Sequence, residues 1–284
     1  MEDIIKKADV LVEALPYVRA FHNKIFVIKY GGRVMLSEAA QRGLWEDLAF
    51  LHFVGVRPVL VHGGGPSITQ KAASMGKIAK FVEGRRVTDA AMIKIVEETL
   101  SEINTNLTKS IEKLGVPTVG LNGAKNNIIN VKKMSAKVDL GFVGEITDIN
   151  PELIKEALKN KSIPIIIPLG KGKDKFTYNV NADDAASAIA TVLKAEKFIL
   201  LTDVKGIMRQ PDDDGSLIST LSQKDAQDLI GRKVIQEGMI PKVKACINAL
   251  NQGVKKTHII DGRLQHAILL EIFTDKGIGT EIVK

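Results

Sequence analysis

Two stretches of the chain decide its fold, KIFVIKYGG at residues 24–32 and PVLVHGGGP at residues 58–66. Each joins a short apolar run, rich in β-branched side chains, to a cluster of glycines, which is typical of a buried strand that ends in a turn. Similar runs recur later, and the segments between them have helical periodicity. The later strand-like runs are Pro164–Ile167, Phe198–Leu201 and Thr257–Ile260, and the helix-like segments are Ser37–Val54, Asp89–Leu114, Asp183–Leu193, Ser222–Ile230 and Met239–Asn251.

This alternation predicts an α/β protein whose mainly parallel central sheet is covered by helices on both faces. Chemistry is then expected in loops at the carboxyl ends of the strands, where the glycines fall. Between residues 120 and 147 short alternating runs bounded by Asn, Gly and Asp predict hairpins that decorate one lobe. We expect three parts, an N-terminal helix over residues 1–22, an N-terminal lobe over residues 23–165 and a C-terminal lobe over residues 166–284.

The amino-acid composition argues against several classes of protein. The 284 residues include 40 Lys and Arg against 33 acidic residues, and this excess is spread along the chain, which argues against nucleic-acid binding. A single cysteine, Cys246, excludes a disulfide framework within the chain and indicates a reducing compartment. Because the N-terminus carries charges throughout and no run reaches the ~20 apolar residues of a membrane span, we expect a cytoplasmic protein without membrane contact. The plastid stroma is the alternative if the gene lies in a plastid genome.

The two glycine loops favour the binding of anions. Glycine at a strand end lets backbone N–H groups approach an anion, and a helix that follows adds the positive end of its dipole. Strand-to-helix turns also favour glycine for their own sake. The second loop is not a dinucleotide-binding motif, because Ile68 stands where its third glycine belongs, and no P-loop occurs. Lys29, at the end of the first strand, is placed to neutralise phosphate charge.

Three later segments add polar side chains at similar places. In YNVNADD, residues 178–184, Asn181 or Asp183 either caps a helix or faces a substrate. The segment LTDVKGI, residues 201–207, is suited to contacts with ribose and adenine, although a capped turn after the strand would have the same residue pattern. In GMIPKV, residues 238–243, Lys242 opposes the dipole of the helix that it opens, which indicates an anion nearby. Histidine spacing predicts no metal site, and we expect His62 to pack or to hydrogen-bond its loop.

Together these segments resemble the acetylglutamate kinases, a branch of the amino acid kinase family, whose members form an open three-layer αβα sandwich. The resemblance runs in order from about residue 24 to the C-terminus. It rests on KYGG at residues 29–32, VHGGGP at 61–66, FVEGRRVT at 81–88, VDLGFVGEIT at 138–147, YNVNAD at 178–183, LLTDVKG at 200–206, GMIPKV at 238–243 and FTDKGIGT at 273–280.

The resemblance implies an enzyme that uses ATP to phosphorylate the side-chain carboxylate of N-acetyl-L-glutamate, giving N-acetyl-L-glutamyl 5-phosphate in the second step of arginine biosynthesis. Mg²⁺ would be carried on the nucleotide phosphates, with no metal held by the protein. The implied catalytic residues are Lys29 and Lys242, which stabilise the transition state, and Asp183, which holds both lysines. The implied binding residues are Gly64, Gly65, Arg86 and Asn179 for the acceptor and Gly31, Gly32, Thr202, Asp203, Gly206 and Ile207 for the nucleotide.

Other functions stay open at this point. The chain could be another family member, such as carbamate kinase or aspartokinase, or an arginine-sensing binding protein with decayed activity. The intact Lys29, Asp183 and Lys242 argue against decay. Three places depart from the usual pattern of the branch. Arg33 either tightens phosphate binding or points to solvent, Glu237 changes the expected flexibility of its loop, and NGAK at residues 122–125 replaces the commoner SGKD-like turn.

The N-terminal segment carries an apolar stripe ahead of the first strand. The stripe consists of Ile4, Ala8, Leu11, Leu15 and Val18, which recur at helical spacing. One interpretation is a helix packed on its own domain. In arginine-inhibited members of the branch, however, a similar helix interlaces dimers into a hexamer, and arginine binds beside it near the stretch that Glu271 and Gly277 match. The resemblance therefore implies a hexamer, a trimer of dimers, inhibited by arginine, with a PII signalling protein as a candidate partner.

Overall fold

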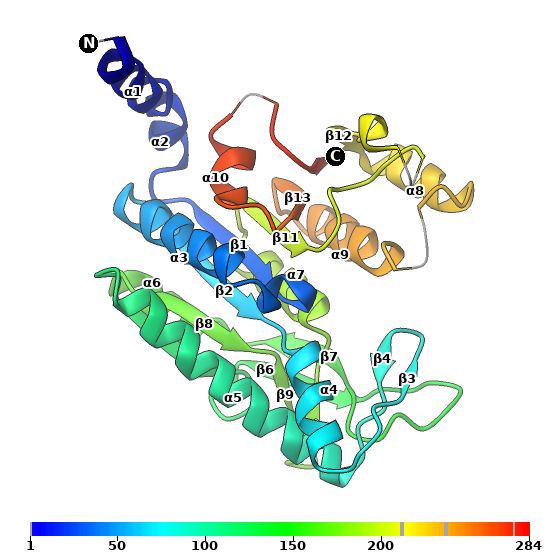
Figure 1. Cartoon of the computed structure of the whole chain (residues 1–284). Helices are drawn as coiled ribbons and strands as arrows, with labels where there is room; N and C mark the ends of the chain where they lie inside the picture. The colour runs from blue at the N-terminus through cyan, green and yellow to red at the C-terminus, as the bar shows by residue number, and fades with distance from the viewer. Residues whose placement is uncertain (1, 211–212, 236–237, 275) are drawn as a thin grey trace.

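The centre of the molecule is an eight-stranded sheet with the strand order β12-β14-β13-β11-β1-β2-β8-β5 (Figure 1). This computed structural model describes residues 2–210, 213–235, 238–274 and 276–284. Neighbouring strands pair in parallel except β13 and β14, which are antiparallel. The strands are β1 (Ile25–Tyr30), β2 (Arg57–His62), β5 (Thr118–Asn122), β8 (Ile163–Ile167), β11 (Lys197–Thr202), β12 (Thr220–Ser222), β13 (Lys256–Asp261) and β14 (Thr280–Val283).

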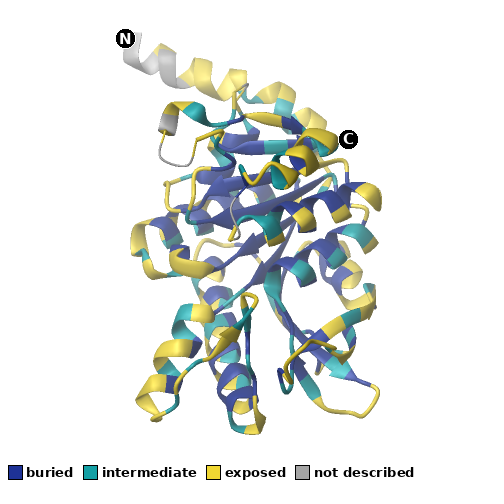
Figure 2. Cartoon of the chain, turned by 90° about the vertical axis from the view of Figure 1, so that its right-hand side faces the viewer, coloured by how far each residue is buried: buried dark blue, intermediate teal, exposed yellow. Residues whose placement is uncertain are grey.

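Helices cover both faces of this sheet because its central strands are apolar on both sides. Successive side chains of a strand point to opposite faces, so Phe26 and Ile28 of β1 pack in one hydrophobic cluster and Val27 packs in another. Figure 2 shows that the strands are almost entirely buried. One face is covered by α3 (Glu38–Phe53), α5 (Ala90–Glu112) and α10 (Ala267–Ile272), and the other by α6 (Glu152–Lys159), α7 (Ala182–Val192) and α9 (Ile240–Asn251).

The predicted α/β sandwich is confirmed, and each of the five strand-like runs and five helix-like segments identified between residues 24 and 260 is present with ends that differ by one or two residues. The predicted hairpin region is confirmed in part. Residues 118–122 form the edge strand β5 of the central sheet, whereas the later strands belong to a second sheet of order β10-β9-β6-β7. These strands are β6 (Ile129–Lys133), β7 (Gly144–Ile149), β9 (Leu169–Gly172) and β10 (Thr177–Asn179). The predicted boundary at residue 165 falls inside β8, so the division into two lobes stays a prediction.

Shorter elements surround the glycine loops. The helix expected after the first loop is only a 3₁₀ helix, η1 (Gly32–Leu36), while the second loop leads into the ten-residue helix α4 (Gly65–Ser74). A separate hairpin consists of β3 (Phe81–Val82) and β4 (Arg85–Arg86). The remaining elements are η2 (Asp214–Ser216) and α8 (Gln223–Gly231).

The N-terminal segment forms two helices, α1 (Glu2–Glu13) and α2 (Leu15–Phe21), instead of one. The break at Ala14 precedes Pro16, which has no N–H to continue the helical ladder. The ring of Phe21 packs on Phe26 and Phe273, but α1 extends away from the body of the molecule (Figure 1), and Leu11 is 69% exposed. Along its described side chains, α1 is therefore not packed on its own domain; the side chain of Ile4 lies outside those described.

No helix among the described residues is both long enough and apolar enough to cross a bilayer.

Candidate active site

Three charged side chains from separate elements meet at the carboxyl end of β1. The Nζ atom of Lys29 lies 2.9 Å from Oδ1 of Asp183, and the Nζ atom of Lys242 lies 2.8 Å from Oδ2 of the same carboxylate. Asn181 caps α7 by accepting hydrogen bonds from the backbone N–H groups of Asp183 and Asp184. This cap orients the first turn of α7, so that Asp183 holds both lysines. The anion expected beside Lys242 is therefore Asp183.

The electrostatics of this triad favour a bound anion. Burial raises the pKa of the Asp183 carboxyl, but the two ammonium groups outweigh burial and hold the pKa well below its usual range. The carboxylate is therefore ionised at neutral pH. One negative charge between two positive charges leaves the triad with a net positive charge in a largely buried place, which attracts anionic groups.

Two cavities meet at Lys242. The first, which we call the glycine cavity, has a volume of about 270 Å³ and the second, the Thr202 cavity, has a volume of about 340 Å³. Lys242 lines both of them. The glycine cavity is also lined by Lys29, Gly32, Gly63, Gly64, Gly65, Arg85, Arg86, Asn179 and Asp183, and the Thr202 cavity by Arg33, Thr202, Asp203, Gly206, Ile207, Gly238 and Met239.

The two glycine loops lie side by side at the glycine cavity, as the sequence predicts. The N–H group of Gly63 donates to the Tyr30 carbonyl at 2.7 Å and joins the loops. Gly64 is the N-cap of α4, and a Cβ there would lie 2.7 Å from a methyl group of Leu100. A Cβ at Gly65 would meet no atom within 4 Å in the described part of the chain. The N–H groups in the first turn of a helix have no partner within that helix, and Gly64 and Gly65 at the start of α4 line the cavity, which suits an anion.

Arg86 reaches the same cavity from the β3–β4 hairpin. Its Nη2 donates to the Gly65 carbonyl at 2.9 Å and to Oγ1 of Thr69 at 2.8 Å, and its guanidinium lies over the Phe81 ring. Within the described part of the chain its buried Nη1 has no hydrogen-bond acceptor. Asn179 is linked to Arg86 through Thr88, whose Oγ1 accepts from Nδ2 of Asn179 and donates to the Arg86 carbonyl. A buried guanidinium with an unused donor is suited to a carboxylate.

The Thr202 cavity contains the polar end of β11. Thr202 is buried and Asp203 follows it, while Ile207 donates its backbone N–H to Oγ1 of Thr280 at 2.8 Å. Gly206 has a φ of +148°, and a Cβ there would lie 2.7 Å from the same hydroxyl oxygen. The four nucleotide residues predicted from 202–207 are therefore brought together. Gly32 instead lines the glycine cavity, and Gly31 lies between the loops in neither lining.

Arg33 agrees with the interpretation that it points largely to solvent, and its expected effect on phosphate binding stays a prediction. Its side chain is 80% exposed, yet its Nε donates to Oδ2 of Asp203 at 2.6 Å across the Thr202 cavity. Burial raises the pKa of Asp203, but the Arg33 hydrogen bond contributes to a net lowering. Glu237, another of the departures, lies outside the described residues.

His62 has a structural role, as expected. Its Nδ1 donates to the Gly63 carbonyl at 2.9 Å, and its Nε2 accepts from Nδ2 of Asn104 at 3.1 Å. Burial lowers the pKa of His62 to about 4, so the ring is neutral near pH 7. Asn104 also donates to the Ile165 carbonyl and so fixes the ring against β8. Sequence reasoning missed Asn104, because one polar residue in the long helix α5 gives no signal of a buried contact.

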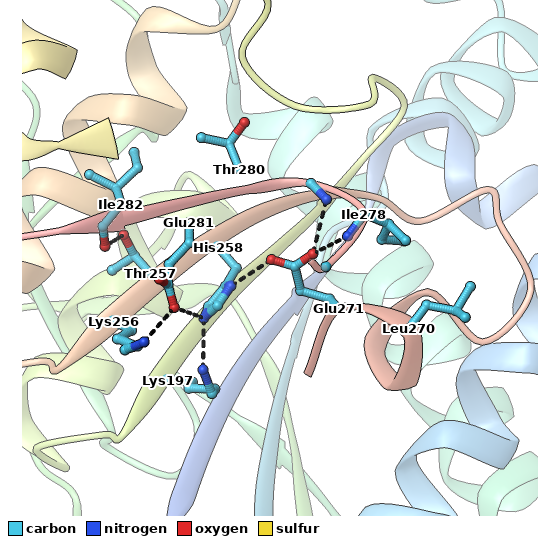
Figure 3. Close-up of polar contacts among 12 residues, drawn as sticks. Lys197, Lys256, Thr257, His258, Leu270, Glu271, Ile278, Thr280, Glu281 and Ile282 are labelled. Carbon is cyan, nitrogen blue, oxygen red and sulfur yellow. Dashed lines mark hydrogen bonds and ion pairs between the residues drawn. The ribbon is translucent and has the colours of Figure 1, made fainter. Parts of the chain in front are cut away.

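Glu271 lies in a second polar cluster, with His258 and Lys197 (Figure 3), and Gly277 lies against the Glu271 carboxylate. Oε1 of Glu271 accepts from Nδ1 of His258 at 2.8 Å, and Oε2 accepts from the backbone N–H groups of Ile278 and Gly279. Gly277 has a φ of +63°, and a Cβ there would lie 2.6 Å from Oε2 of Glu271. The Glu271 carboxylate therefore holds the loop at residues 278–279, and a side chain at position 277 would force that carboxylate to shift.

Two residues of this second cluster were missed by sequence reasoning. Nε2 of His258 lies 3.1 Å from Nζ of Lys197, on the neighbouring strand. Burial lowers the pKa of Lys197 to about 8 and also lowers the pKa of His258. Nζ of Lys197 in turn lies 5.2 Å from the centre of the Phe21 ring. The second cluster thus lies directly beneath α2.

In the described residues, no three His, Cys, Asp or Glu side chains are grouped as metal ligands would be.

Comparison with known proteins gives consistent relatives. The sequence profile of the amino acid kinase family matches residues 24–261. The acetylglutamate kinase of Desulforamulus reducens is 49% identical over 281 residues, covering 98% of both chains. The acetylglutamate kinase of Aquifex aeolicus is 47% identical over 298 residues, covering 99% of each.

Solved structures agree on the fold. N-acetylglutamate synthase from Neisseria gonorrhoeae, in complex with coenzyme A and N-acetyl-glutamate, superposes with a TM-score of 0.87 at 27% identity over 98% of this chain. The chain spans 63% of the length of that synthase. Carbamate kinase from Giardia lamblia bound to AMP-PNP has a TM-score of 0.65 at 17% identity, covering 92% of this chain and 99% of its own.

Proposed function

The chain belongs to the amino acid kinase family and, within it, to the acetylglutamate kinases, and we propose that its two cavities bind the two substrates of that kinase reaction. The reaction is the ATP-dependent phosphorylation of N-acetyl-L-glutamate in arginine biosynthesis. The glycine cavity holds the acceptor and the Thr202 cavity holds ATP. The observation that carries this assignment is that Lys242, which shares the Asp183 carboxylate with Lys29, lines both cavities.

The chemistry needs little beyond positioning and charge. The side-chain carboxylate of the acceptor has a pKa near ~4, so it is already a nucleophile at neutral pH and needs no general base. This agrees with a neutral, fully bonded His62. Lys29 and Lys242 neutralise the negative charge that gathers on the transferring phosphoryl group. Asp183 keeps its low pKa and serves to hold both lysines in place.

The proposed substrate contacts use hydrogen-bond donors of the two cavities. The Nη1 of Arg86, with Asn179 beside it, pairs with the α-carboxylate of the acceptor, and the N–H groups of Gly64 and Gly65 face its reacting end. The Gly31–Gly32 loop, next to Lys29, faces the transferring phosphoryl group. On the other side Thr202, Asp203, Gly206 and Ile207 contact the nucleoside. Mg²⁺ enters bound to the ATP phosphates, as part of the substrate.

A substrate panel tests this function. With ATP and magnesium, ADP formation is expected to depend on N-acetyl-L-glutamate and to be negligible with L-glutamate, carbamate or L-aspartate. Hydroxylamine should trap the acyl phosphate as a hydroxamate in the same reaction. ADP formation that depends on carbamate or aspartate instead would assign the chain to another branch, and arginine binding without any turnover would identify a decayed sensor.

We also infer that the N-terminal helices and the second polar cluster form an arginine-responsive device in a hexamer. The exposed apolar residues of α1 supply a surface that needs a partner, and α2 lies over Lys197 of the second cluster. The N-acetylglutamate synthase from Neisseria gonorrhoeae has also been solved with L-arginine, at a TM-score of 0.80 and 26% identity over 98% of this chain and 65% of its own. The candidate PII partner is tested by adding purified PII protein to the arginine assay.

Deletion of residues 1–20 should convert the hexamer into an active dimer with a blunted arginine response. The deletion removes α1 and most of α2 but leaves both cavities intact. Light scattering measures the assembly, and an arginine titration of ADP formation measures the response. The control is Ile78→Gln in the full chain, which changes another exposed apolar residue. A truncated protein that stays hexameric or fully arginine-sensitive would disprove this device.

A further inference from the structure

The β3–β4 hairpin depends on its side chains for its position. Its strands pair only Phe81 with Arg86 and Val82 with Arg85, and they form a sheet of their own. The turn between them has positive φ angles at Glu83 and Gly84, which is typical of a tight hairpin turn. In Figure 1 the hairpin stands beside α4, apart from the central sheet. A two-residue strand pair contributes little by itself, so contacts at its base decide where it lies.

Those contacts come from two adjacent arginines. Successive side chains of a strand point to opposite sides, and Arg86 accordingly bonds to α4 while Arg85 turns toward α7. Nη2 of Arg85 lies 3.0 Å from Oδ2 of Asp184, and the two side chains are 29% and 43% exposed. Both arginines line the glycine cavity. The hairpin is thus tied to α4 and α7, which both contribute residues to the lining of that cavity.

The Arg85–Asp184 ion pair also neutralises a charge close to the triad. Asp184 follows Asp183 in the first turn of α7 and receives its N–H hydrogen bond from the same cap, Asn181. Without Arg85, the negative charge of Asp184 would stand unpaired one residue from Asp183, which lines the proposed acceptor cavity. Arg85 also lines a further cavity, of about 430 Å³, together with Asp184 and Glu145. Within the described residues its buried Nη1 has no hydrogen-bond acceptor. Arg85 thus pairs with Asp184 and also lines the glycine cavity.

We propose that the Arg85–Asp184 ion pair is a positioning contact for the acceptor: it ties the hairpin that carries Arg86 to α7, and it cancels a carboxylate that would otherwise repel the anionic acceptor. The inference rests on the proposed function, because it takes N-acetyl-L-glutamate as the acceptor. Arg85 acts on affinity for the acceptor and leaves the reacting atoms to Lys29 and Lys242.

The kinetic test uses Arg85→Met, Asp184→Asn and the double variant. Arg85→Met removes the tie and exposes the Asp184 charge, so the KM for N-acetyl-L-glutamate should rise on the order of 5- to 20-fold, with kcat and the KM for ATP changed less than about threefold. The double variant should have a lower KM than Arg85→Met, because the repelling charge is gone. Arg85→Lys should recover most of the affinity. Arg57→Met, which removes the same charge at the far end of β2, should match the wild type.

A second measurement examines the tie without substrate. Amide hydrogen exchange in the peptide that covers residues 79–89 should be faster in Arg85→Met and in Asp184→Asn than in the wild type. An unchanged KM in Arg85→Met, a double variant no better than Arg85→Met, or unchanged exchange would each overturn the proposal. A wild type that forms no ADP with N-acetyl-L-glutamate would overturn the proposed function instead, and hydrogen exchange alone would then decide whether the tie exists.

Discussion

Replacing Lys242 by alanine is expected to lower kcat by about 30- to 1,000-fold while the KM values for both substrates change less than about threefold. Lys242 touches the Asp183 carboxylate at 2.8 Å and lines both cavities, so in the proposed reaction its ammonium group lies where the phosphoryl group passes between them. A fixed cation at that place stabilises the transition state more than it does either bound substrate. The range corresponds to ~2–4 kcal/mol, which is typical of one electrostatic stabiliser.

Steady-state kinetics with matched variants separates this effect from a general loss of charge. Lys244→Ala removes the same charge from an exposed position on the same helix and should leave kcat unchanged. Arg86→Lys should show the opposite pattern, a raised KM for N-acetyl-L-glutamate at similar kcat, because an ammonium group at the end of a flexible chain cannot both keep the Nη2 contacts with Gly65 and Thr69 and supply the Nη1 donor to the carboxylate. Near-normal kcat in Lys242→Ala would remove Lys242 from the mechanism.

The strands and the glycine loops could be predicted from the sequence because their signals are local. The run IFVI lies between Lys24 and Lys29 and is followed, after Tyr30, by two glycines, so it predicts a buried strand and a tight turn without knowledge of the rest of the chain. The contact between Asp183 and two lysines has no such signal, since it depends on three elements that meet only in the folded sheet. Its prediction came from the resemblance to the kinase family.

The elements that were missed show where local signals fail. In β9 the glycines 170 and 172 break the alternation typical of a strand, yet a Cβ at Gly170 would clash with Val131 of the neighbouring strand β6. Packing in β9 therefore requires glycine at position 170, and that glycine is also what weakens the strand signal in the sequence. His258 had a clearer signal, a polar side chain inside the apolar run THII, and its partner Lys197 lies near it because β11 and β13 pair in parallel register.

Replacing Asp183 by asparagine is expected to lower the free energy of unfolding by about 3–5 kcal/mol at pH 7 and to lower kcat by at least about 100-fold. Removal of one partner from a buried ion pair leaves the other charge uncompensated. In this variant the ammonium groups of Lys29 and Lys242 would both face one neutral amide. Urea unfolding measures the first effect. The control is Asp184→Asn, one residue away and partly exposed, which should cost less than about 1 kcal/mol.

The pH dependence of this difference is also expected. Because the pKa of Asp183 is lowered in the folded state, its contribution is fully present above the unfolded pKa of about 4 and is lost as the pH falls through the lower folded pKa. The gap in stability between wild type and Asp183→Asn should therefore be constant from pH 7 to pH 5 and shrink below about pH 4. A gap that persists undiminished at low pH would mean that the variant had lost packing and not an ion pair.

A second substitution separates stability from catalysis. In the double variant Asp183→Asn with Lys29→Met, one of the two uncompensated ammonium groups is replaced by an apolar side chain in a site where Lys29 is already buried. Much of the lost stability should return, because one buried charge has been removed, whereas kcat should fall further, because a phosphate-neutralising cation has gone with it. If the double variant were as unstable as Asp183→Asn, charge repulsion would not be the cause of the instability. If it recovered activity, Lys29 would have no part in phosphoryl transfer.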